Sequence, residues 1–205
     1  MTRDALPMFP LGTVLFPHAL LPLQVFEPRY RVMMRRLLDG DREFGVVLIE
    51  RGSEVGGGDV RFDIGTLARI VQAAELPDGR WALVCAGVRR VRVLRWLADD
   101  PYPQADVEEI DEAADPPGAG DARGRVADAF DAVVELVQRL GAQIDQLPVF
   151  DSDPVQGVYE MAAAAPIEVL DAQRVLEASD HEARSVLLAR MLRERADDLQ
   201  ARLAE

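Results

Sequence analysis

Residues 8–40 read MFPLGTVLFPHALLPLQVFEPRYRVMMRRLLDG, and they determine how the first half of the chain is built. Prolines interrupt the apolar runs at four positions, namely Pro10, Pro17, Pro22 and Pro28. Because proline cannot donate a hydrogen bond within a sheet, it is confined to strand ends, edges and bulges. The sequence therefore predicts two brief buried strands, residues 13–16 and 20–26, that are separated by forced bends.

Pro28 opens a different pattern. Its ring presets φ, and its missing N–H is not needed at the first position of a helix. After it, apolar residues recur at helical spacing, namely Tyr30, Met33, Met34, Leu37 and Leu38. Arg35 and Arg36 suit the negative end of the helix dipole, and Gly40 is a typical stop. We therefore predict a helix that begins at Pro28 and ends at Gly40.

The motif PLGTVLFPHALLPLQVFEPRYR resembles the opening of the Lon N-terminal domain, the substrate-binding module of Lon-type ATP-dependent proteases, which also occurs alone in bacteria. The resemblance continues through FGVVLI (44–49), IGTLARI (64–70), GVRRVRVLRW (87–96) and PYPQADVEEI (101–110). Residues 158–203 are more loosely similar to the helical segment behind that module. The resemblance implies a stand-alone bacterial member of the family, without the ATPase and protease domains.

Strand and turn signals after the first helix predict a β-rich module. Residues 44–49 are continuously apolar, Gly65 interrupts an alternating strand, and Pro77-Asp78-Gly79 fits a hairpin turn. Many short strands with glycine bends are typical of a small closed barrel, and the family resemblance implies its PUA-like form. The predicted fold class is α+β, with an N-terminal PUA-like β-barrel module that holds one early helix, followed by a C-terminal α-helical bundle.

Composition divides the chain into two modules. Residues 111–121 (DEAADPPGAGD) are acidic and rich in proline and glycine, which predicts an exposed linker. This linker separates a Lon N-terminal-like β module at residues 1–110 from a helical module at residues 122–205. The second module has four segments with helical spacing, and Asp153-Pro154 is a helix-start signal within it. Four amphipathic helices predict a small bundle.

Charge and cysteine content limit the partners and the compartment. The net charge is −13, which disfavours nucleic-acid backbones and anionic membranes. Residues 1–98 carry +3 and residues 99–205 carry −16, which again indicates two modules. Cys85 is the single cysteine, and no signal peptide or membrane-spanning stretch is visible. We therefore predict a cytoplasmic protein.

The residues for catalysis are absent. Complete Lon proteases use a P-loop lysine and a Ser-Lys dyad, and this chain contains no lysine. The loop at Gly56-Gly57-Gly58 leads into a strand rather than the helix that a phosphate site requires. His18 and His181 lie far apart, with neither a nucleophile nor a zinc cluster at a recognisable spacing. We therefore predict no enzymatic activity, no cofactor and no metal site.

The candidate site for a peptide or protein partner is the junction between the predicted strands and the first helix. It comprises Phe26, Glu27, Arg29, Tyr30 and Met33. Aromatic and methionine side chains offer adaptable apolar contact, while the charged pair can orient a ligand. In the alternative interpretation, Glu27 caps the helix, Arg29 anchors a turn, and the apolar residues belong to the core.

Three functions compete at this stage. The first, which we prefer, is a non-catalytic module that binds unfolded or extended polypeptide, or a protein partner, as a substrate-recognition or adaptor protein linked to proteolysis. It would act through groove burial and strand addition. The second is RNA binding by a PUA-like protein, which the net charge disfavours but an arginine cluster supports. The cluster comprises Arg89, Arg90, Arg92 and Arg95. The third is an enzyme of unknown type, for which no constellation is found.

Overall fold

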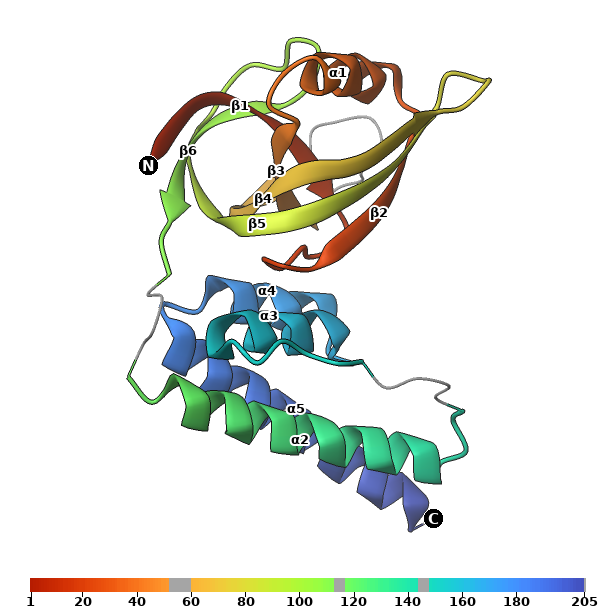
Figure 1. The fold of residues 1–205 in the computed structure, drawn as a ribbon, viewed down its shortest axis with the longest axis vertical. Coiled ribbons are helices and arrows are strands. Elements are labelled where there is room, and N and C mark those ends of the chain that lie inside the picture. The colour runs from red at the N-terminus through yellow and green to blue at the C-terminus, as the bar shows by residue number, and fades with distance from the viewer. Residues whose placement is uncertain (52–59, 113–116, 144–147, 205) are drawn as a thin grey trace. The chain divides into compact units, whose positions relative to one another are not determined.

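The computed structural model describes residues 1–51, 60–112, 117–143 and 148–204. The chain forms two compact units, Met1–Asp111 and Glu112–Glu205. The first unit holds a mixed sheet and the helix α1, and the second holds the helices α2 to α5 (Figure 1). In the described residues the protein is therefore α+β, with one mixed sheet and five helices, as predicted.

Five strands of the first unit form a closed circuit. The unit has six strands among its described residues, namely β1 (Thr2–Leu11), β2 (Leu20–Val25), β3 (Glu43–Arg51), β4 (Val60–Glu75), β5 (Trp81–Trp96) and β6 (Gln104–Ile110). Their order is β2-β5-β4-β3-β1-β6, and β5 also pairs with β6, which closes the circuit. The pairing of β1 with β3 is parallel and the others are antiparallel. The strand β2 lies outside the circuit. The PUA-like form of a barrel stays a prediction.

The start of the chain differs from the prediction. Residues 13–16 form no strand, and the first strand is β1 instead. The reason is long-range, because Met8–Leu11 gains a parallel pairing with Gly45–Leu48 that no local pattern reveals. Leu15 is nevertheless buried, and the Thr66 hydroxyl donates a hydrogen bond to its carbonyl at 2.5 Å.

The helix α1 (Pro28–Leu38) begins with proline at its first turn, as predicted. It lies across one end of the strand circuit (Figure 1). Its buried face is the predicted one, formed by Tyr30, Met33, Met34 and Leu37. The helix ends without a left-handed Gly40. Arg42 adopts the positive φ of 59° instead, and its N–H donates to the Leu37 carbonyl at 3.0 Å.

Two glycine positions are as predicted. The β3–β4 register shifts just beyond the pair Val47↔Gly65, which confirms a bulge. A Cβ at Gly65 would lie 2.2 Å from the Val46 carbonyl oxygen, so the two backbones approach more closely than any other residue permits. Gly79 has a φ of 77° in the hairpin turn between β4 and β5, where the αL region favours glycine.

One charged residue from each strand of the circuit joins a single ion-pair network. Arg3 donates to Glu43 at 2.7 Å and to Glu109 at 2.5 Å. Arg69 reaches Glu43 at 2.6 Å, and Arg89 reaches Glu109 at 2.9 Å. Burial acts to raise the pKa of the Glu109 carboxyl, but the hydrogen bond from Arg3 and the two arginine charges hold it below its usual value. The network therefore ties β1, β3, β4, β5 and β6 together.

The second unit consists of helices in its described residues. They are α2 (Ala119–Arg139), α3 (Pro154–Ala164), α4 (Val169–Glu177) and α5 (His181–Leu203). Asp153 caps α3 through the Val155 and Gln156 N–H groups, as predicted. Asp180 caps α5 through the Ala183 N–H at 2.8 Å. The helix α2 packs against α3 and α5, and the arrangement of the four helices as a bundle stays a prediction.

The structure describes both ends of the predicted linker at residues 111–121, and residues at each end take part in the second unit. At its end, α2 already begins at Ala119. Near its start, Glu112 accepts hydrogen bonds from the Tyr159 hydroxyl at 2.5 Å and from Arg184 at 3.1 Å. Residues 113–116 lie outside the described residues. The division into modules at residues 110 and 122 stays a prediction. In the described part of the chain, no helix combines the length and hydropathy needed to cross a bilayer.

Candidate functional site

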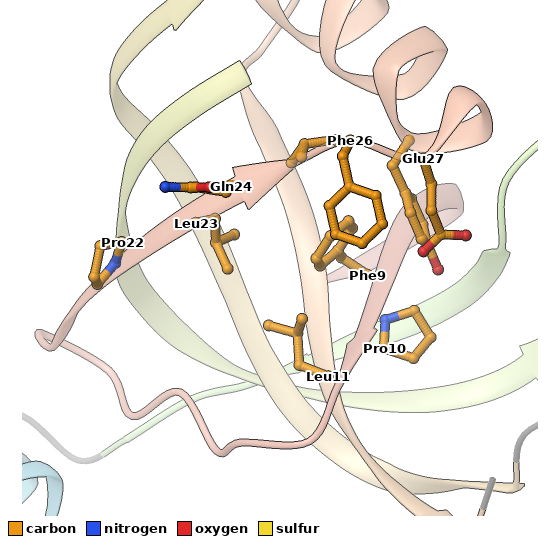
Figure 2. Close-up of a pocket in the computed structure, with 10 residues that line it drawn as sticks. Phe9, Pro10, Leu11, Pro22, Leu23, Gln24, Phe26 and Glu27 are labelled. Atoms are coloured by element: carbon orange, nitrogen blue, oxygen red, sulfur yellow. The ribbon is translucent and has the colours of Figure 1, made fainter. Parts of the chain in front are cut away.

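A pocket of about 220 Å³ opens where β1 ends, β2 runs and α1 begins. Its lining side chains are apolar except for one amide, one carboxylate and one phenol. The lining residues are Phe9, Pro10, Leu11, Pro22, Leu23, Gln24, Val25, Phe26, Glu27 and Tyr30. Figure 2 shows the Phe26 ring and the Glu27 carboxylate at the α1 end of the pocket, with Pro22 at the far end of β2. A mostly apolar concavity with few polar groups is the usual form of a binding site.

The floor of the pocket is formed by buried side chains, and its rim is exposed. Tyr30 and Val25 are buried, and the Tyr30 ring packs on Phe9 with their centroids 4.2 Å apart. Phe26 remains 55% exposed and Leu20, further along β2, is 67% exposed. Large apolar side chains at this exposure, beside a buried aromatic floor, form a surface that a partner can cover.

The strand β2 presents an outer backbone edge beside the pocket. The Gly87 N–H donates to the Ala19 carbonyl and the His18 N–H donates to the Gly87 carbonyl, both at 2.9 Å, so the backbone carbonyl of Ala19 faces β5 just before the ladder begins. Hydrogen-bonded pairs alternate with non-hydrogen-bonded pairs along an antiparallel ladder. Leu21↔Cys85 and Leu23↔Leu83 are therefore hydrogen-bonded pairs. The backbone groups of Leu20, Pro22 and Gln24 consequently point away from β5, to an edge on which no further strand pairs among the described residues.

This register explains the proline inside β2. Pro22 has no N–H to donate, and at its position the missing donor falls on the outer edge, where no ladder bond is lost. The outer edge still offers three carbonyl groups and the N–H groups of Leu20 and Gln24. These are the backbone groups that an added strand would use.

The charged residues at the start of α1 form a small cluster. Glu27 occupies the N-cap position, but its side chain makes no capping hydrogen bond. Its carboxylate instead accepts a hydrogen bond from Arg29 Nε at 3.1 Å, and Arg29 Nη1 lies 3.8 Å from Asp99. The guanidinium also lies 4.6 Å from the centre of the Tyr30 ring. Two carboxylates therefore share one guanidinium, and the cluster carries a net charge of −1.

The structure separates the five residues predicted for the site. Phe26, Glu27 and Tyr30 line the pocket. Arg29 does not line it but contacts two of these residues. Met33 is 0% exposed and lies in the core, as the alternative interpretation holds for its side chain. A binding site at this pocket therefore leaves Met33 out.

Sequence reasoning missed the wall that β1 contributes. Phe9, Pro10 and Leu11 reach the pocket only because β1 pairs in parallel with β3. The position of Pro22 within an apolar run was the available signal for the β2 wall, because it marks an edge strand.

The arginine cluster of β5 is neutralised by carboxylates of β6. Arg95 pairs with Asp106 at 2.6 Å, Arg89 pairs with Glu109 at 2.9 Å, and Arg92 lies 3.9 Å from Glu108. The fourth arginine, Arg90, is buried. An RNA backbone at this cluster would compete with these carboxylates for the guanidinium groups.

Two other kinds of chemistry find no support in the described residues. No group of three or more His, Cys, Asp or Glu side chains there is arranged to hold a metal ion. The Cys85 thiol is fully buried, and burial raises its pKa to about 12. A protonated, enclosed thiol is not a nucleophile.

A comparison with protein families shows to which family this chain is related. The family model of the ATP-dependent protease La (LON) substrate-binding domain matches residues 5–194. The chain belongs to the Lon substrate-binding domain family. The match runs through both compact units, so the family's domain includes the helices of the second unit as well as the strand circuit.

Two relatives of this Lon substrate-binding domain are named as Lon proteases. The chain is 28% identical to Lon protease 2 of Herpetosiphon aurantiacus over 205 residues, which is 97% of this chain and 25% of that protein. It is 27% identical to the Lon protease of Escherichia coli K12 over 202 residues, with 97% of this chain and 26% of that protein covered. The chain thus spans about a quarter of the length of these curated relatives.

Solved structures show the same domain fold. A Lon N-terminal domain protein from Xanthomonas campestris superimposes with a TM-score of 0.67 at 27% identity, covering 93% of this chain and 99% of that one. The N-terminal domain of a Mycobacterium avium complex Lon protease gives a TM-score of 0.61, covering 95% and 99% of the two chains. Its identity is only 18%, so that likeness concerns the fold.

Proposed function

We propose that this Lon substrate-binding domain recognises unfolded or extended polypeptide through the pocket between β1, β2 and α1. The observation that carries the proposal is the combination of a buried aromatic floor, an exposed Phe26 and an unpaired strand edge at one place. Membership of the family supports a substrate-recognition role linked to proteolysis. The protein would act as a recognition or adaptor module.

The size of the pocket fits a side chain rather than a whole small molecule. Pockets for drug-sized ligands run from about 300 to about 1,000 Å³, and this one measures about 220 Å³. One large apolar side chain of an extended segment would enter it, while the segment's backbone adds to the outer edge of β2. Backbone pairing then supplies affinity without sequence preference, and the pocket selects apolar residues.

The domain acts in this proposal without chemistry of its own. The chain has no lysine for the Lon ATPase or for a Ser-Lys dyad, so any hydrolysis of the bound polypeptide falls to a separate active site. A cytoplasmic location and the PUA-like form of the strand circuit complete the proposal.

A binding measurement with a matched pair of variants tests the pocket. Phe26→Ala should weaken binding of a fluorescent, apolar, extended peptide about tenfold, because a buried aromatic contact contributes about 1.5 kcal/mol or more. Leu94→Ala is the control, since Leu94 has the same 55% exposure but lies on β5 outside the pocket. Fluorescence anisotropy gives both affinities. Equal affinities for the two variants would place the binding site elsewhere.

Modified peptides test the strand addition separately. Methyl groups on alternate backbone nitrogens of the peptide remove donors without changing its side chains. One of the two alternating methylation patterns should abolish binding and the other should be tolerated, because only alternate N–H groups face β2. If both patterns bind as well as the unmodified peptide, the peptide is held by side chains alone.

A further inference from the structure

We infer that Glu27 makes the pocket selective for apolar segments that carry an Arg or Lys side chain two residues from the apolar residue in the pocket. This inference rests on the proposed function of the pocket and specifies its substrate class. It makes Glu27 a specificity-determining residue rather than a helix cap.

The first observation is the charge of the pocket. Glu27 is the one carboxylate among the lining residues, and no cationic side chain lines the pocket with it. Its nearest cation is Arg29, which it shares with Asp99. The single guanidinium balances only one of the two carboxylates, so the three side chains have a formal net charge of −1, which the positive end of the α1 dipole offsets in part.

The second observation is the shielding of that charge from water. The Glu27 and Arg29 side chains are only 16% and 18% exposed, and Phe26 and Tyr30 flank them. Charges interact more strongly where the surroundings are less polar than water. A peptide that covers Phe26 would exclude still more water, so a cation brought there would gain attraction and an anion would meet repulsion.

The spacing follows from strand geometry. Side chains of an extended peptide alternate between two faces, and residues two apart on one face are separated by about 6.8 Å. Glu27 lines the same pocket as the apolar floor. A cation at the second neighbour of the buried apolar residue would therefore face Glu27, whereas one at the first neighbour would point away.

The test uses four peptides, acetylated and amidated so that only side chains carry charge. Three peptides differ at the second neighbour of a fixed central apolar residue, which is Arg, Gln or Glu, on the side that approaches α1. In the fourth, the Arg is moved to the first neighbour. We expect the Arg peptide to bind about fivefold more tightly than the Glu peptide, from an attraction and a repulsion of about 0.5 kcal/mol each. Moving the Arg should remove most of its advantage.

Two variants assign the preference to Glu27. Glu27→Gln keeps the size of the side chain and an oxygen that can accept from Arg29, and it should bind all four peptides alike. Glu108→Gln is the control with the same change of charge, because Glu108 lies on β6 outside the pocket and is half exposed. It should keep the fivefold preference. The preference should also shrink as salt rises from about 0.1 M to about 1 M, where the Debye length falls from about 10 Å to about 3 Å.

The outcomes separate this inference from the proposed function. If the unmodified protein binds the four peptides equally, the selectivity is wrong while peptide binding stands. If Glu27→Gln keeps the preference, Glu27 is not its source and the inference fails. If no peptide binds at all, the proposed function fails with it. An unchanged urea midpoint for Glu27→Gln shows that the variant remains folded.

Discussion

In the first compact unit the acidic partners of an ion-pair network are buried, whereas in the second unit the basic partner of an ion pair is buried. In the first unit, the carboxylates of Glu43 and Glu109 are inside, and the arginines that reach them are nearer the surface. In the second unit, the Arg184 guanidinium is inside with 0% exposure, while its partner Glu112 is 21% exposed. Each buried carboxylate of the first unit has two arginine partners.

This difference shows why ion pairs of similar length can contribute differently to stability. Removing one partner of a buried pair is costly mainly because the other charge stays behind without compensation. In the first unit, a second arginine remains beside each carboxylate. In the second unit, the carboxylate of Glu112 also accepts from the Tyr159 hydroxyl, and the Tyr159 ring stacks on Arg184 at 4.2 Å. Two side chains there donate to one carboxylate.

The largest effect is therefore expected at Glu112. Glu112→Ala should lower the free energy of unfolding of the second unit by about 3 kcal/mol, because it removes a carboxylate to which the buried guanidinium of Arg184 donates. Urea unfolding followed by far-ultraviolet circular dichroism reports this unit, which holds most of the helix. Adding Arg184→Met to the variant should recover at least about 1 kcal/mol by removing the buried charge. A further loss in the double variant would show that Arg184 stabilises mainly through its packing.

A smaller effect is expected at Arg3, the centre of the network in the first unit. Arg3→Ala should cost about 1.5 kcal/mol, since Glu43 keeps Arg69 and Glu109 keeps Arg89. Both tryptophans belong to β5, so the tryptophan fluorescence reports the first unit alone. Arg80→Ala is the control, because its pair with Asp78 is local and exposed. A loss as large as that of Glu112→Ala would contradict the role of redundancy.

The smallest expected effect is on how the stability of the first unit depends on pH. The pKa of Glu109 is held below its usual value in the folded protein, so Glu109 contributes fully to stability above its unfolded pKa of about 4.3. This contribution is lost as the pH falls through the lower, folded pKa. Glu109→Gln should therefore show a shallower loss of stability between about pH 5 and about pH 3 when tryptophan fluorescence is followed. Parallel curves for the two proteins would mean that Glu109 titrates normally.

Local signals in the sequence predicted the elements that local chemistry determines. Pro28 and the apolar spacing after it placed α1 and its buried face, and Asp153-Pro154 placed the start of α3. The glycine bulge at Gly65 followed from an interrupted alternation in the strand. These features depend on residues within a few positions of each other. The strand predicted at residues 13–16 failed because β1 draws its stability from β3, more than thirty residues away.

Only part of the candidate site could be predicted from the sequence, because the rest depends on contacts between residues far apart in the chain. Phe26, Glu27 and Tyr30 stand close together in the chain, so the junction of strand and helix suggested them directly. Whether an apolar residue on α1 faces a pocket or the core depends on what packs against it, and Met33 faces the core. The β1 wall and the outer edge of β2 required the strand order.

The sequence by itself determined the family, the α+β class and the first helix, because motifs and composition are local or global properties of the chain. The tertiary structure alone decided which charges pair and which line a pocket. Arg89, Arg92 and Arg95 look like a cationic stripe until the antiparallel pairing of β5 with β6 places a carboxylate beside each. Glu27 looks like a helix cap until the fold places it in a pocket with a shared guanidinium. Pairing of charges depends on distances through space, and the order of residues does not specify those distances.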